Sequence, residues 1–209
     1  MALLRAERTP SSRTDAIVVA GVAVAVAAVV AQLTAQLVDY LLFDLRLPLL
    51  DSNKHRSLFG AASLLAHTFA LAAAFAGSLL RPRRLPWDLL WFSLAILLLL
   101  RVFVGFNLLQ AAPFVLVVFV VVWKMAAHAS RGAAATLRIA VALLAVSFLV
   151  HVAAPGSEST LGYQRHSWEY QIRGMIKHGA SLTGWILLAS GIAAVIVRRE
   201  PSRTASPSG

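Results

Sequence analysis

The sequence predicts an all-α membrane protein, a polytopic bundle of transmembrane helices. Of its 209 residues, 59% are hydrophobic and 13% are charged, and the mean hydropathy is +0.75. Soluble domains are about 45–50% apolar and about 25% charged. The apolar residues also form runs long enough to cross a hydrocarbon core of about 30 Å. We therefore expect a multi-pass protein in the lipid bilayer of a plasma membrane or bacterial inner membrane.

The first predicted span is residues 16–38, which contain no charged residue. A basic segment precedes it, as in a signal peptide, but the run is longer than the roughly 7–15 residues of a signal-peptide core. We expect an uncleaved helix with Thr14 or Asp15 as its N-cap. Residues 1–14 are then a mobile basic arm.

The second span, 58–80, lies between Arg56 and the basic segment 81–84. The next apolar block, 87–123, is too long for one helix, and polar residues, glycine and proline interrupt it near 105–113. This favours two spans, 87–105 and 111–127, with Pro113 in the first turn of the second. The alternative is a five-span protein in which this block is one span and a re-entrant segment.

The fifth span, 134–154, ends at Pro155 and Gly156, and the last helix is predicted to begin after Ser167 as N-cap. Its first turns are amphipathic and carry Trp168 and Tyr170, so we expect them to lie on or just above the outer interface. The sixth span follows at 177–197. The bundle thus covers 15–198, and 199–209 form a disordered tail.

Six spans place both termini on one side, and the charges indicate which side. The basic residues there are Arg5, Arg8, Arg13, Arg81, Arg83, Arg84, Lys124, Arg131, Arg138, Arg198, Arg199 and Arg203. These are 12 of the 19 in the chain, against 4 of the 9 acidic residues. Short cytoplasmic loops are enriched in lysine and arginine, so both termini are predicted to be cytoplasmic. Topology accounts for most of the net charge of +10, and no nucleic-acid partner is expected.

Polar residues within the spans are costly unless they face protein or a cavity, and they gather in the outer halves of the helices. Gln32, Gln36 and Asp39 share one face of the first helix. The candidate ligand-binding residues are Arg101, Asp39, Gln36, Gln32, His67, Asn107 and Lys177. We expect an outward-facing pocket centred on Arg101, Asp39, Gln36 and His67, with His67 at its floor.

Structural roles compete with ligand binding at each of these residues. Arg101 and Asp39 are natural partners for an ion pair that only stabilises the fold. His67 can bond to a helix backbone or to Ser63, and Lys177 can extend to the interface from a helix end. These roles leave the binding hypothesis open.

No cofactor is predicted, because the chain has no cysteine and no spacing typical of metal ligands. Haem b is the one group considered further. It needs two histidines on different helices at matching depth, and only His151 with His178 meet that condition.

The specific function stays unresolved at this level. The composition favours a binding, transport or accessory-subunit bundle whose pocket takes an anionic group or a lipid head group. Small residues recur at every fourth position from Ala23 to Ala35, which is compatible with close contact to another membrane protein or a second copy. The alternatives are a membrane enzyme with an outer-leaflet His/Glu site and a b-type haem electron-transfer protein, so enzymatic activity is left open.

Overall fold

A computed structural model describes residues 10–44, 47, 49–50, 57–80, 85–104, 108–152 and 168–198. The described residues are helical apart from a few turn and bend residues. The helices are α1 (Pro10–Leu42), α2 (Leu58–Leu80), α3 (Leu85–Leu99), η1 (Leu100–Val104), α4 (Leu108–Ala127), α5 (Arg131–Val152) and α6 (Trp168–Val197). The all-α prediction is confirmed, and six helices in the described chain are long and apolar enough to span a membrane. The arm 1–9, Asn107, Ser167 and the tail 199–209 lie outside the described residues.

Two serines cap the starts of α2 and α5. The backbone N–H of Gly60 donates to Ser57 Oγ at 3.0 Å, so α2 begins where predicted. At α5 the Ala134 N–H donates to the Ser130 carbonyl at 2.7 Å, and Ala133 N lies 3.4 Å from Ser130 Oγ. Because Ser130 is the N-cap, α5 begins three residues before the predicted span.

Two helix starts differ from the prediction. α1 begins at Pro10, so Thr14 and Asp15 lie within the helix and are not its N-cap. Proline suits this first position because it has no N–H to satisfy and its φ is already helical. α4 begins at Leu108, which places Pro113 in the second turn instead of the first. There the missing N–H removes a bond to the carbonyl of residue 109.

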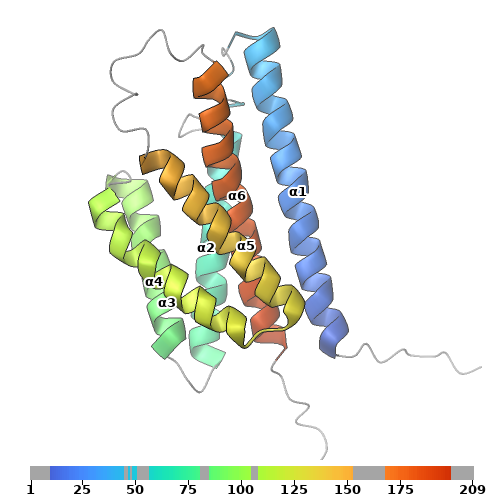
Figure 1. The fold of residues 1–209 in the computed structure, drawn as a ribbon, viewed down its shortest axis with the longest axis vertical. Helices are drawn as coiled ribbons and strands as arrows, with labels where there is room; N and C mark the ends of the chain where they lie inside the picture. The colour runs from blue at the N-terminus through green and yellow to red at the C-terminus, as the bar shows by residue number, and fades with distance from the viewer. Residues whose placement is uncertain are drawn as a thin grey trace, which may run out of the picture.

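α6 is one continuous helix of 30 residues, about 45 Å long. Its amphipathic first turns therefore continue the membrane-span-like part of the helix and lie along α1 (Figure 1). The rings of Trp168 and Tyr40 meet there, with centroids 4.4 Å apart. α6 is thus long enough to carry polar groups beyond the hydrocarbon core.

Helices α2 to α6 form a closed ring in which each helix packs on the next and α6 packs back on α2. α1 lies outside this ring, against α6 and the start of α5 (Figure 1). The start of α1 and the end of α6 lie at the same end of the bundle, which we call the terminal end. We call the other end of the bundle the opposite end. A cytoplasmic position for the terminal end stays a prediction.

The terminal half of the bundle contains a closely packed apolar core. The fully buried side chains there include Leu90, Leu94, Leu137, Leu188 and Ile192. Glycines bring the helices together: a Cβ on Gly191 would lie 2.7 Å from the Leu137 side chain. The opposite half of the ring is less completely filled, and it contains the candidate site.

Candidate functional site

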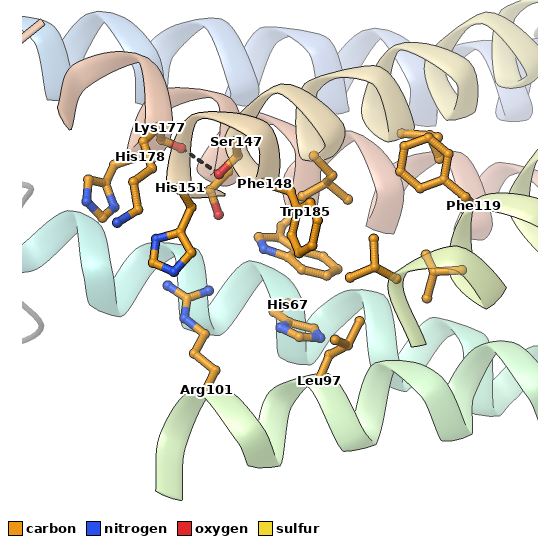
Figure 2. A pocket seen from close by; sticks show the side chains of 15 residues that line it. His67, Leu97, Arg101, Phe119, Ser147, Phe148, His151, Lys177, His178 and Trp185 are labelled. Atoms are coloured by element: carbon orange, nitrogen blue, oxygen red, sulfur yellow. Dashed lines mark hydrogen bonds between the residues drawn. The ribbon is translucent and has the colours of Figure 1, made fainter. Parts of the chain in front are cut away.

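A cavity of about 200 Å³ lies inside the ring, in its opposite half (Figure 2). All five ring helices contribute to its lining. The polar lining residues are His67, Arg101, Ser147, His151, Lys177, His178 and Ser181. For comparison, a dry cavity of about 150 Å³ in another protein binds benzene. The cavity is therefore large enough for a small ligand or for one end of a larger one.

The remaining walls are apolar. They consist of Leu97, Val115, Val118, Phe119, Val141, Leu144, Phe148 and Trp185. Most of these come from α4 and α5. Because the polar groups lie toward the opposite end and the apolar ones deeper, the cavity has an amphipathic interior.

Arg101 is placed by η1, a π-helical turn that continues α3. Such turns are rare and occur frequently at functional sites. Arg101 Nη1 donates to Ser63 Oγ at 3.2 Å, and Ser63 Oγ lies 3.4 Å from Ser181 Oγ. These contacts connect η1, α2 and α6 across the ring. A guanidinium has five N–H donors, so one bond to a neutral hydroxyl leaves capacity for an anion.

His67 forms part of the cavity wall next to Trp185. Its Nε2 lies 3.1 Å from the carbonyl of Leu94 on α3. A carbonyl only accepts, so Nε2 donates and carries the proton. The ring stacks on Trp185 with centroids 3.8 Å apart and planes 6° from parallel. The expected backbone partner is thus found on a neighbouring helix, while Ser63, the other expected partner, bonds Arg101.

α5 and α6 bring three more basic or titratable side chains to the site. The Ser147 hydroxyl donates to the carbonyl of Lys177 at 2.8 Å, which fixes the two helices relative to one another. Figure 2 shows Arg101, His151 and Lys177 directed toward a common region, with His178 beside them. No aspartate or glutamate lines the cavity in the part of the chain that the structure describes.

The prediction of one pocket for all four central residues is wrong. Arg101 and His67 line the cavity, whereas Gln36 and Asp39 lie on the other side of α6. Gln36 and Asp39 lie on α1, outside the ring, and do not line the cavity. Asp39 Oδ1 accepts the N–H of Leu47 at 2.9 Å, while Arg101 bonds Ser63. The expected ion pair between Arg101 and Asp39 is therefore not formed in the described chain.

The α1 side of α6 forms a separate polar seam. Gln36 Nε2 donates to Gln171 Oε1 at 2.6 Å. Gln32 lies against Gly179, fully buried, and neither atom of its amide has a hydrogen-bond partner among the described residues. This seam joins α1 to α6, and its residues do not line the cavity of the ring.

Sequence reasoning missed four polar or aromatic residues of these two regions: Ser147, Gln171, Ser181 and Trp185. A signal was present for two of them. His178, Ser181 and Trp185 follow one another at spacings of three and four, which places them on one face of a helix. Gln171 and Ser147 needed the partner helix to be known.

The cavity of about 200 Å³ is small for a haem. His151 and His178 do line the same cavity, but a haem has several times as many atoms as the benzene that fills about 150 Å³. No group of three or more His, Asp or Glu side chains that could hold a metal ion occurs among the residues described. What the arrangement offers chemically is recognition of an anion with an apolar body. No protein-family model, no curated protein and no solved structure matches the chain.

Proposed function

We propose that this integral membrane protein binds a small anionic amphiphile, or the anionic end of a larger one, in the cavity of the ring. The carboxylate or phosphate would lie at Arg101 and the apolar part against α4 and α5. The observation that carries the proposal is a guanidinium at the polar end of a largely apolar cavity, with a neutral hydroxyl as its bonding partner.

The energetics favour an anionic ligand. A charged side chain deep in a membrane costs about 2.5–3.5 kcal/mol by insertion scales, and an opposite charge offsets that cost. Hydrogen bonds to a charged group contribute about 1.5–3 kcal/mol. The planar guanidinium can bond two oxygens of a carboxylate or phosphate at once, and Lys177 adds a second cation on the same wall.

The apolar walls limit the ligand in size and favour a chain. Each buried methylene contributes about 0.8 kcal/mol. A volume of about 200 Å³ accommodates a head group and a few carbons, so a longer chain would extend into the bilayer. With the terminal end in the cytoplasm, as the charge distribution favours, the site belongs to the outer leaflet.

The test uses the fluorescence of Trp185, which lines the cavity. In detergent-solubilised protein, 8-bromooctanoate should quench part of the tryptophan emission in a saturable way, because bromine on a bound chain lies near this ring. Trp185→Phe should remove that component. Arg101→Gln should weaken binding by about 10- to 100-fold, the loss of one charged hydrogen-bonding partner.

Two controls separate the cavity from general adsorption. Arg13→Gln makes the same substitution at an exposed arginine of α1 near the terminal end, outside the cavity, and should leave the affinity unchanged. The methyl ester of the probe lacks the charge and should bind far more weakly. Equal affinities for acid and ester, or an unaltered affinity in Arg101→Gln, would refute the proposal.

A further inference from the structure

A second basic region lies on the outside of the bundle, where α4 and α5 meet at the terminal end. Lys124, His128, Arg131 and Arg138 are all exposed there. Arg138 is seven residues into α5, about 10 Å beyond the helix start. At this depth an arginine on the bundle surface faces acyl chains unless its side chain reaches the interface.

The Arg138 side chain does extend toward the terminal end. Its guanidinium lies over the ring of Trp123, with Cζ 5.4 Å from the ring centroid. Trp123 is four residues from the end of α4, so it is about three residues, or 4.5 Å, nearer to that end than Arg138. Tryptophan favours this interfacial level. The pair therefore fixes a cation at the depth of lipid head groups.

The cation–π contact with Trp123 involves no oxygen acceptor, so the N–H groups of Arg138 remain available for one. The described residues provide no hydrogen-bond acceptor for Arg138. The five N–H groups of an arginine form a planar fork that matches two oxygens of a phosphate. An exposed guanidinium on a surface that also carries Lys124 is complementary to a phosphodiester.

The surface beyond the pair is suited to acyl chains. Leu116, Val120 and Trp123 follow at spacings of four and three, and all three are exposed on one face of α4. On α5, Ala142 and Val146 continue from Arg138 at spacings of four and are also exposed. These stripes lead from the guanidinium toward the middle of the bilayer.

We propose that Arg138 and Trp123 form a binding site for an anionic phospholipid in the leaflet at the terminal end. The phosphate would lie on the edge of the Arg138 guanidinium and the chains on the stripes of α4 and α5. The site is independent of the cavity and of its ligand, since it lies outside the ring and in the other half of the bundle.

The experiment compares retention of phosphatidylglycerol and phosphatidylcholine with identical chains by native mass spectrometry of the full chain released from mixed micelles. The wild type should retain phosphatidylglycerol preferentially. Arg138→Gln should lower that preference about fivefold, which corresponds to about 1 kcal/mol for one basic residue at a membrane surface. Arg138→Lys keeps the charge without the planar fork and should have an intermediate effect.

Arg173→Gln is the matched control, because it removes an exposed arginine from α6 at the opposite end and should leave the preference unchanged. Absence of a preference in the wild type would overturn the proposal, as would an equal loss in Arg173→Gln. A loss in Arg101→Gln alone would assign the lipid to the cavity instead. Competition by millimolar inorganic phosphate would indicate a free-phosphate site and also overturn it.

Discussion

The two polar sides of α6 face different surroundings. On the ring side, Lys177 and Ser181 border a cavity, and their neighbours leave room for a ligand. On the α1 side, Gln171 bonds Gln36 directly and Gly179 lies against Gln32. The first side leaves polar groups around a space, whereas the second buries them between two helices. Similar depth in the membrane therefore does not imply a shared role: one group is suited to recognition and the other to holding α1 in place.

The largest expected effect comes from adding bulk where α1 and α6 touch. A Cβ on Gly21 would overlap the side chain of Ser190, so Gly21→Leu should lower the free energy of unfolding by about 3 kcal/mol or displace α1. Thermal unfolding followed by circular dichroism measures this. Ala27→Leu adds bulk to an exposed face of α1 and should be neutral. Equal effects of the two substitutions would mean that α1 is not closely packed.

The amide pair of the seam should behave as a unit. Gln36→Leu leaves Gln171 without this bond and should cost about 2 kcal/mol of stability. Adding Gln171→Leu removes the second amide of the pair and should recover part of that loss. A double-mutant cycle on the free energy of unfolding then gives the coupling energy of the two residues. Anion binding in the cavity should be the same in all variants. Loss of binding would show that the two sides of α6 are coupled.

A substitution at Gln32 should raise the stability of the protein, whereas those above lower it. Its buried amide lacks partners among the described residues, so Gln32→Leu should raise stability by about 1 kcal/mol through removal of an unpaired polar group. Chemical denaturation would measure this gain as a higher midpoint concentration of denaturant, with the slope of the unfolding free energy against denaturant unchanged. Destabilisation would instead indicate that the amide binds water or another group in the seam.

The smallest expected effect is on the cavity side. Ser63→Ala removes the hydroxyl that accepts from Arg101, and such bonds within membrane bundles average about 0.6 kcal/mol. Affinity for 8-bromooctanoate should fall about threefold, with unchanged Tm. Thr68→Ala on the same helix is the control, since its hydroxyl bonds only its own helix at the carbonyl of Leu64. A tenfold loss of affinity in Ser63→Ala would instead indicate that the serine contacts the ligand directly.

The sequence was sufficient for features that depend on the order of residues along one helix. The limits of α2 and the division of 87–123 into two helices agree with the structure. Helix ends shifted where a local rule competed with hydropathy: Pro10 and Ser130 each start a helix before the apolar run begins. Hydropathy reports where a chain can be buried in lipid, while capping chemistry decides where its helix starts.

Only part of the site could be inferred in the same way. His67 and Arg101 were identified by their depth, and both line the cavity. Asp39 was paired with Arg101 by depth as well, but α6 lies between the ring and α1. A helix that is apolar on nearly all sides has little periodicity to indicate which face meets which neighbour.

The sequence by itself thus determined the helices, their order and the position of each polar group along its helix, because hydropathy and capping act within a single segment. Which polar groups meet was decided by the tertiary structure. That choice depends on contacts between segments far apart in the chain, such as Gly21 against Ser190 and Ser63 with both Arg101 and Ser181. Close packing of side chains fixes which face of each helix contacts which neighbour. The sequence of one helix alone does not contain this information.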